Sequence, residues 1–203
     1  MENIAKIVYI NLDRRTDRRE QMEAECERMG LQMERFSAIP HETIGLVGCG
    51  LSHLNVLKQA KQQSLKNVLI LEDDFQFSVS REELEKRVEE LFTYKQDFDV
   101  CMFTYFELES EPETTDCPPT LRKVKSASTA ACYIVNEHYY SALIEVLQYA
   151  MPLLEATNHH WVFANDQVWK ELQKKDNWVC VVPEVGHQRE GYSDCSNSYR
   201  TDI

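Results

Sequence analysis

The segment that most constrains the fold is the apolar run 68–71, which is followed by the three adjacent acids Glu72, Asp73 and Asp74. An unbroken apolar run is typical of a strand that is buried on both faces of a sheet. Side chains alternate along a strand, so Glu72 and Asp74 are expected to point one way and Asp73 the other. Three neighbouring carboxylates repel one another unless a cation or hydrogen-bond donors offset their charge. The pattern fits either a strand that runs into a solvated acidic turn or a divalent-metal site at the carboxyl end of a strand, where open α/β sheets bind ligands.

Periodicity and turn signals predict strands that alternate with helices, most regularly in the first half of the chain. We expect strands over residues 5–11, 31–38, 68–71, 100–105, 121–124, 130–135 and 178–182. We expect helices over residues 17–29, 51–63, 81–94, 136–149 and 159–174, the third opened by a capping box at Ser80 and the fourth capped by Asn136. Residues 107–119 hold five acids and three prolines and are expected to form a surface loop, and residues 183–203 an irregular tail. The prediction is one α/β domain, residues 1–203, with a central, mostly parallel mixed sheet of about six or seven strands flanked by helices.

Composition excludes some classes of partner. The net charge of -12 argues against nonspecific binding to nucleic acid or to an anionic membrane, because the phosphate contribution would be repulsive. No apolar segment approaches membrane-spanning length, and the first residues lack the pattern of a signal peptide. Seven scattered cysteines lack the close paired spacing of a zinc site, and Cys101, Cys132 and Cys180 lie inside apolar runs. Together these features favour a reducing, cytoplasmic setting, which would be the host cytoplasm for a viral protein.

Four arginines, Arg14, Arg15, Arg18 and Arg19, lie where the first predicted strand gives way to a helix. Cations at a helix start oppose the helix dipole, so the cluster is locally unfavourable. It is either a solvated helix face, helped by an i,i+4 pair of Arg19 with Glu23, or a group that holds a diphosphate.

Three further segments carry polar residues that suit a binding site. The glycine-rich segment 48–53, which includes Ser52 and His53, is predicted to lead into a helix whose free backbone N–H groups suit an anion or a nucleotide. Asp166 lies at a predicted helix start, where the dipole alone would favour an acid. His187 and Gln188 lie in the polar tail, where packing gives no reason for them and a ligand role is an alternative.

Three blocks taken together resemble glycosyltransferase family 25, which includes lipopolysaccharide glycosyltransferases and collagen galactosyltransferases. The blocks are residues 8–19 (VYINLDRRTDRR), 48–53 (GCGLSH) and 69–74 (LILEDD), and they follow the order and spacing of that family. Residues 130–135 and 183–188 are looser matches. The chain is short for the family, as a viral or minimal member or one domain of a longer protein would be.

The resemblance implies a GT-A fold that uses a nucleoside-diphosphate sugar and Mn2+, with Mg2+ as the alternative ion. Residues 1–105 would form the nucleotide-sugar half and residues 106–203 the acceptor half. The donor would be a UDP-sugar and the acceptor a glycan or a glycoprotein. The implied metal ligands are Asp74, Glu72 and His187; the implied donor-binding residues are Tyr9, Asn11 and Leu12 around the base, Arg14 and Arg18 at the diphosphate, and Ser52, His53, Glu72, Asp73 and Gln188. Asp74 is also assigned to catalysis, and Asp166 to acceptor binding or to general-base catalysis.

The residues leave two other classes of function open. One is a noncatalytic domain of the same fold that binds a sugar nucleotide or a glycan. The other is a metal-dependent phosphohydrolase built on the acidic strand end, against which the first strand counts because it lacks an Asp-x-Asp and is followed by arginines.

Overall fold

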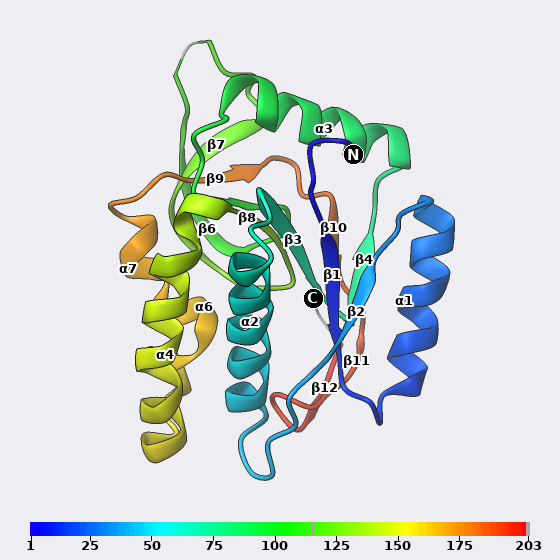
Figure 1. Cartoon of the computed structure of the whole chain (residues 1–203), viewed down its shortest axis with the longest axis vertical. Coiled ribbons are helices and arrows are strands. Elements are labelled where there is room, and N and C mark those ends of the chain that lie inside the picture. Colours follow the sequence, from blue (N-terminus) through cyan, green and yellow to red (C-terminus); the bar gives the residue numbers. More distant parts are fainter. Residues whose placement is uncertain (115, 202–203) are drawn as a thin grey trace.

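A mixed sheet of eight strands forms the centre of the computed structural model, which describes residues 1–114 and 116–201 (Figure 1). The strands lie in the order β2-β1-β3-β8-β5-β9-β7-β6. Their bounds are β1 Ile7–Asn11, β2 Glu34–Ser37, β3 Asn67–Glu72, β5 Val100–Met102, β6 Phe106–Pro112, β7 Leu121–Ser128, β8 Cys132–Asn136 and β9 Trp178–Val181. Strands from both predicted halves of the chain share this sheet, since β8 lies between β3 and β5.

The sheet is mixed, as predicted, but antiparallel pairs outnumber parallel ones. Strand β1 pairs in parallel with β2 and β3, and β5 pairs in parallel with β9, whereas the other four neighbouring pairs are antiparallel. Strand β6 is the strand of this sheet that was not predicted, and most of it lies in the predicted surface loop 107–119. It is the last strand of the sheet, where charged residues and proline are tolerated because one edge faces solvent. Residue 115 of that loop and residues 202 and 203 of the tail lie outside the described residues.

Helices cover both faces of the sheet (Figure 1). Their bounds are α1 Thr16–Met29, α2 Gly45–Gln62, α3 Arg81–Tyr94, α4 Tyr140–Thr157, α5 His160–Phe163, α6 Asn165–Val168 and α7 Lys170–Gln173, with a 3-10 turn at Glu137–Tyr139. Alternate residues of the buried strands face opposite ways, so Ile70 packs with α2 and α4 whereas Leu69 and Leu71 pack with α1 and α3. Among the described residues, no helix combines the length and the hydrophobicity needed to cross a lipid bilayer.

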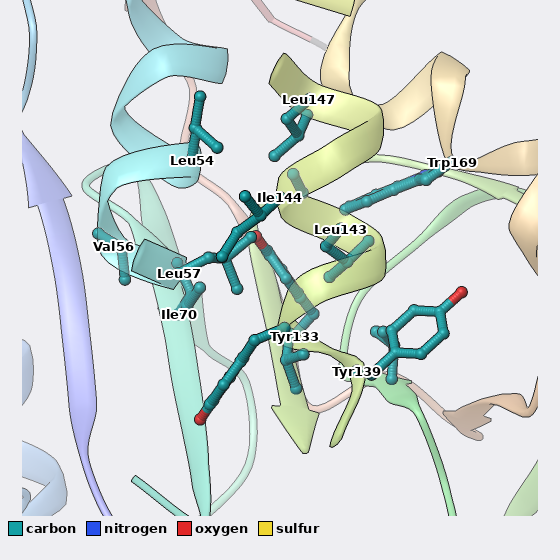
Figure 2. Packing of buried hydrophobic residues seen from close by; sticks show 14 of the residues in the cluster. Leu54, Val56, Leu57, Ile70, Tyr133, Tyr139, Leu143, Ile144, Leu147 and Trp169 are labelled. Atoms are coloured by element: carbon teal, nitrogen blue, oxygen red, sulfur yellow. The ribbon is translucent and has the colours of Figure 1, made fainter. Parts of the chain in front are cut away.

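The layer formed by α2 and α4 fixes the position of α2 on the sheet (Figure 2). Leu54 and Leu57 of α2 face Leu143 and Leu147 of α4 across a buried cluster. Gly50 lets the two helices approach, because a Cβ at this position would collide with the Met151 side chain. This close packing holds the first turns of α2 at the end of the sheet where the acidic residues lie.

Helix α2 begins at Gly45, six residues before the predicted start. Glycine disfavours a helix interior, so the sequence predicts a flexible approach over this segment. In the structure a Cβ at Gly48 would lie 2.5 Å from the carbonyl oxygen of Ile39, and one at Gly45 would collide with the backbone of Asp194. The glycines are therefore required by neighbouring backbone, and the helix forms around them.

Two helices in the second half differ from the prediction. Asn136 is no helix cap, because its side chain donates to the carbonyl of Phe98 at 2.6 Å and a 3-10 turn precedes α4. The predicted helix 159–174 is divided into α5, α6 and α7, with an extended Ala164 between the first two. By contrast, Ser80 accepts a hydrogen bond from the Glu83 amide and caps α3 as predicted.

The tail contains strands that no periodicity indicates. Strand β10, Gly186–Gln188, pairs with β4, Phe75–Phe77, and β11, Gly191–Ser193, pairs with β12, Ser198–Arg200. Because β4 follows directly after the three acids, pairing with β10 brings the tail back to the acidic end of β3.

Candidate functional site

A cleft of about 670 Å³ opens at the carboxyl ends of β1 and β3. Its lining includes all three acids that follow β3, the first turns of α2, the loop 39–43, the start of α6 and parts of the tail. This is the end of a parallel strand pair at which open α/β sheets bind ligands, as the acidic segment predicted. The cleft is the candidate site among the described residues.

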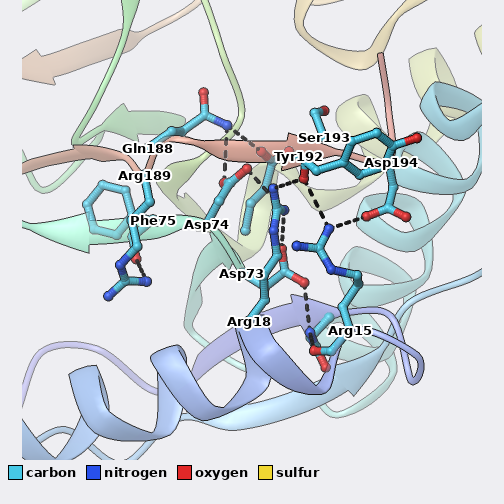
Figure 3. A network of polar contacts seen from close by, with 12 residues as sticks. Arg15, Arg18, Asp73, Asp74, Phe75, Gln188, Arg189, Tyr192, Ser193 and Asp194 are labelled. Carbon is cyan, nitrogen blue, oxygen red and sulfur yellow. Dashed lines mark hydrogen bonds and ion pairs between the residues drawn. The ribbon is translucent and has the colours of Figure 1, made fainter. Parts of the chain in front are cut away.

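Asp73 is held on one side of the acidic turn by a fixed set of donors. The Asn11 amide donates to Asp73 Oδ2 at 2.7 Å, and Arg18 Nη1 lies 2.7 Å from Asp73 Oδ1. The same Arg18 nitrogen lies 3.1 Å from Asp74 Oδ2 (Figure 3). Arg18 and both aspartates are largely buried, so the guanidinium compensates two carboxylates that would otherwise repel each other in the protein interior.

Glu72 and Asp74 share a different partner, the side-chain amide of Gln188. Its Nε2 lies 3.2 Å from Glu72 Oε2 and 3.2 Å from Asp74 Oδ1. Burial, followed by the negative charge of Glu72, raises the pKa of Asp74 to about 6. Burial alone would raise the pKa of Glu72, but interaction with His53, the hydrogen bond from Cys49 and the charge of Arg200 together outweigh it and leave that pKa below its ordinary value. Glu72 and Asp74 thus meet on one side, as predicted, while Asp73 turns toward Asn11.

Gln188 reaches the acids through the pairing of β10 with β4. Gln188 is opposite Phe75 in this pair, and the Arg189 amide donates to the carbonyl of Asp74 at 2.6 Å. Alternation along β10 leaves His187 exposed on the other face, away from the cleft. The structure brings Gln188 to the carboxylates as expected for a ligand-binding residue, and it does not bring His187 there as a metal ligand.

Helix α2 forms the second side of the cleft with an imidazole and a thiol. His53 is fully buried; its Nε2 lies 3.3 Å from Glu72 Oε1 and its Nδ1 lies 2.9 Å from the Tyr133 hydroxyl. The Cys49 thiol donates to the same Glu72 oxygen at 3.5 Å. A hydrogen bond with the Cys195 thiol, together with burial, raises the pKa of Cys49 well above its ordinary value.

The predicted anion site at residues 48–53 is altered by the early start of α2. These residues lie inside the helix rather than before it, where backbone N–H groups are used in the helix itself. The Ser52 hydroxyl donates to the Gly48 carbonyl at 2.7 Å and accepts from the Ile39 amide at 2.8 Å. Ser52 therefore lines the cleft while fixing the loop 39–43, and its hydroxyl is already bonded.

Three of the four arginines bind the tail, which neither alternative for the cluster anticipated, whereas Arg19 pairs with Glu23 at 2.9 Å as the solvated-face alternative predicted. Arg14 Nη2 lies 2.8 Å from Asp194, and Arg15 also pairs with Asp194. Arg15 and Arg18 both donate to the carbonyl of Tyr192, at 3.1 and 2.9 Å (Figure 3). Burial raises the pKa of Asp194, but hydrogen bonds from Arg15 and Arg14 outweigh it and lower the pKa overall. The cluster attaches the hairpin β11–β12 beside the acids.

Tyr9, Asn11 and Leu12, which were predicted to surround the nucleotide base, do not all face the cleft, because side chains alternate along β1. Leu12 lines the cleft, whereas Tyr9 is buried on the opposite face among residues that pack with α1 and α3. Asn11 is also buried. Its side-chain amide donates to Asp73 and to the Arg15 carbonyl, and its side-chain oxygen accepts a hydrogen bond from Arg35. The structure thus supports Leu12 as a cleft residue and gives Asn11 a role in holding Asp73.

Asp166 lines the far side of the cleft, at the start of α6. Its Oδ2 accepts a hydrogen bond of 3.0 Å from the amide of Thr129, a β-branched residue with a φ of 78°. Such a conformation is strained for threonine, so Asp166 helps to hold an unfavourable turn at the cleft edge. The neighbouring Asn165 is 5% exposed, and its Nδ2 has no partner among the described residues. Sequence reasoning missed Asn165, and also Arg200 of the tail, because no local pattern marks either residue.

The comparisons with known proteins agree with this geometry. The sequence model of glycosyltransferase family 25 (LPS biosynthesis protein) matches residues 42–156, which is more than half of the 203 residues. A glycosyltransferase 25 family member of Drosophila pseudoobscura pseudoobscura is 37% identical over 98 residues, 35% of this chain and 16% of that protein. A putative glycosyltransferase of Acanthamoeba polyphaga mimivirus is 38% identical over 99 residues, 38% of this chain and 30% of that protein.

The fold also has a solved counterpart. The crystal structure of mannose-1-phosphate geranyltransferase from Thermus thermophilus aligns with a TM-score of 0.51 and 8% identity, over 89% of this chain and 74% of that chain. At this identity the likeness shows the fold alone, and it confirms the predicted GT-A-like α/β class. With the family model, the relatives and the acidic cleft in agreement, this chain belongs to glycosyltransferase family 25.

Proposed function

We propose that this chain is a metal-dependent glycosyltransferase that transfers a hexose from a UDP-sugar to a glycan or glycoprotein acceptor. The observation that carries the proposal is the convergence of Glu72 and Asp74 on one point of a cleft of about 670 Å³ in a member of this family. Sugar transfer leaves a nucleoside diphosphate whose charge grows as the glycosidic bond breaks. A cleft for this reaction needs a means to offset that charge.

The acidic end of β3 suits a hard divalent cation. Glu72 Oε2 and Asp74 Oδ1 each lie 3.2 Å from the Gln188 amide nitrogen, so two carboxylate oxygens of different residues are close enough to share one partner. Carboxylate oxygens are the ligands that Mg2+ and Mn2+ prefer, and the raised pKa of Asp74 reflects a buried charge that lacks sufficient compensation. Glu72 and Asp74 would hold the ion, which would supply Lewis-acid neutralisation of the diphosphate.

The other cleft residues would bind and orient the two substrates. Leu12 provides an apolar surface for the base, and Arg14, 59% exposed, is the arginine of the cluster that is free to contact a diphosphate as well as Asp194. Arg18 would act at one remove, because its guanidinium holds Asp73 and Asp74 in position. On the opposite side, Asp166 and the unpartnered amide of Asn165 would form hydrogen bonds with hydroxyl groups of the acceptor, and Asp166 is the candidate general base.

The test is binding followed by product analysis. Calorimetry with UDP is expected to show tight binding with Mn2+ and weak binding with a chelator, because a diphosphate without a cation would meet like charge at Glu72 and Asp74. Incubation with a panel of nucleotide sugars and glycan acceptors should then yield a glycosylated product. Equal UDP affinity with and without chelator would contradict the metal site, and Mn2+-dependent binding without transfer would indicate a noncatalytic domain of the same fold.

Arginine variants refine the position of the diphosphate. Arg14→Ala is expected to lower UDP affinity about ten- to hundredfold and to leave uridine affinity unchanged, because one charge-assisted contact contributes roughly 1.5–3 kcal/mol. Arg19→Ala is the matched control, since Arg19 pairs with Glu23 on the exposed side of α1. An equal loss of UDP and uridine affinity in Arg14→Ala would place Arg14 away from the phosphates.

A further inference from the structure

Three donor atoms of different chemical types converge on the side of the cleft formed by α2. They are the Cys49 thiol, His53 Nε2 and Glu72 Oε1, and they all lie within 4.8 Å of one another. The Glu72 oxygen in this cluster is Oε1, whereas Oε2 of the same carboxylate faces Gln188. The cluster is therefore a second set of ligands, which shares Glu72 with the proposed Mn2+ site but uses the other oxygen of its carboxylate.

The fold presents two of these groups in advance. Cys49 and His53 are four residues apart on α2, so both side chains project from one face of the helix toward Glu72. The His53 ring is fully buried, lies 5.7 Å from the Tyr133 ring in a stacked arrangement, and has Nδ1 bonded to the Tyr133 hydroxyl. Such a bond at the far nitrogen is the feature that commonly orients a metal-binding histidine and leaves Nε2 available.

Two of the three distances between the donor atoms match the edges of a tetrahedral zinc site. Zinc bonds of about 2.0–2.1 Å to nitrogen, 2.0–2.2 Å to oxygen and 2.3 Å to sulfur give edges of about 3.4 Å for N···O and 3.6 Å for S···O. The structure has 3.3 Å between His53 Nε2 and Glu72 Oε1, and 3.5 Å between Cys49 Sγ and the same oxygen. The first value is long for an ordinary N–H···O hydrogen bond, which is about 2.9–3.0 Å.

We propose that Cys49, His53 and Glu72 bind Zn2+, with the fourth position open to the cleft. A thiolate, an imidazole and a carboxylate form a donor set that favours a borderline cation such as Zn2+, while the carboxylates on the other side favour Mg2+ or Mn2+. One thiolate and one carboxylate also balance the charge of a divalent ion inside a largely buried site. The cysteine spacing in the sequence does not indicate this site, because the site contains only one cysteine and its ligands come from both α2 and β3.

The test uses Co2+ as a spectroscopic substitute for Zn2+ in the reduced chain, with a reductant that contains no thiol. Tetrahedral Co2+ bound to a thiolate gives visible ligand-field bands and a near-ultraviolet charge-transfer band. We expect both bands at one equivalent of Co2+, and their loss when Zn2+ displaces it. Cys49→Ser should abolish the charge-transfer band, and His53→Gln should lower the affinity for Co2+ and Zn2+ at least tenfold.

Two controls separate this site from its surroundings. Cys26→Ser changes another half-buried cysteine, on α1, and should keep the spectrum. Asp74→Asn removes a ligand of the proposed Mn2+ site and should also keep it, so the zinc site and the proposed function can fail independently. Circular dichroism confirms that each variant is folded. Absence of a thiolate band in the wild-type chain, or a band that survives Cys49→Ser, would overturn the proposal.

Discussion

The two sides of the cleft treat the same acidic strand end in opposite ways. On one side Arg14, Arg15 and Arg18, here called the arginine side, place fixed positive charge against Asp73, Asp74 and the tail. On the other, the helix side, Cys49, Ser52 and His53 contribute a thiol, a hydroxyl and an imidazole from α2. The acids between them therefore meet guanidinium groups in one direction and the hydrogen-bonding side chains of α2 in the other.

This difference teaches that a run of acids is not a uniform site. Asp73 is held by Asn11 and Arg18 and has a structural role, whereas Asp74 has only the Gln188 amide besides Arg18. Burial raises the pKa of both carboxyl groups, that of Asp74 to about 6. Glu72 faces both sides with different oxygens. Hard-cation chemistry is thus expected at Asp74 and soft-ligand chemistry at Glu72 Oε1, and the following changes test that division.

The largest effect is expected from Asp74→Asn. Loss of groups that merely support a metal ligand costs about 10–100-fold in affinity, so loss of a ligand should lower Mn2+-dependent UDP affinity by at least about 100-fold. Thermal stability should hold or rise, because the change removes a buried charge that is repelled by Glu72. Calorimetry and a melting curve measure the two quantities. Glu42→Gln, which changes an exposed acid of the cleft lining, is the control and should bind as the wild type does.

Arg18→Ala should show the cost of breaking the arginine side. The buried guanidinium compensates two carboxylates, and removal of one partner from a buried ion pair costs about 3 kcal/mol or more. For a chain of this size that corresponds to a fall in Tm of about 6–12 °C. If Arg18 interacted only with the helix dipole, Arg18→Ala would raise stability slightly, because it removes a cation from a helix start. The ion-pair and helix-dipole explanations therefore predict opposite changes in Tm.

A double variant isolates the reason for that loss. Adding Asp73→Asn to Arg18→Ala should recover part of the stability, since it removes a carboxylate left without its cation. If the single variant melts at the wild-type temperature, Arg18 is not bound to the acids in solution, and the contrast between the two sides fails.

The sequence predicted the acidic end of β3 and its surroundings because their signals are local. The apolar run of β3, the alternation that pairs Glu72 with Asp74, and the Ser80 cap of α3 each depend on residues within one or two turns. The family resemblance added the cleft-lining residues Leu12 and Gln188 in the same way, from short blocks of sequence.

The remainder depends on pairings between distant segments. The partner of Arg14 and Arg15 is Asp194 in the tail, and no pattern in residues 14–19 indicates it. Likewise, α2 extends back to Gly45 because the tail and the loop 39–43 pack against its glycines, which overrides their low helix propensity. The alternation of β10, which exposes His187 and buries Gln188, could be assigned only once its pairing with β4 was known.

Gly48→Ala should perturb the helix side by an intermediate amount. A Cβ here would lie 2.5 Å from the Ile39 carbonyl oxygen, which is backbone and yields less readily than a side chain. Displacing the loop 39–43 should lower stability by roughly 1–3 kcal/mol, the usual cost of overpacking. It should also weaken UDP binding while leaving the Arg18 contacts intact. Denaturant unfolding measures the first effect, and an unchanged midpoint would mean that the loop is not anchored to α2.

The smallest effect is expected from Arg19→Ala, which separates position from charge within the arginine cluster. Arg19 has the same charge as Arg18 and is adjacent to it, but its side chain is half exposed and pairs with Glu23 at 2.9 Å. An exposed i,i+4 pair contributes about 0.3–0.5 kcal/mol, and removal of a cation from the first turns of α1 offsets part of it. The melting temperature should therefore stay within about 1–2 °C of the wild type and UDP affinity should not change. Because the two neighbours carry the same charge but differ in burial and in what they contact, a large loss in Arg19→Ala would show that the overall positive charge of the helix start, rather than the specific contacts of Arg18, stabilises the acids.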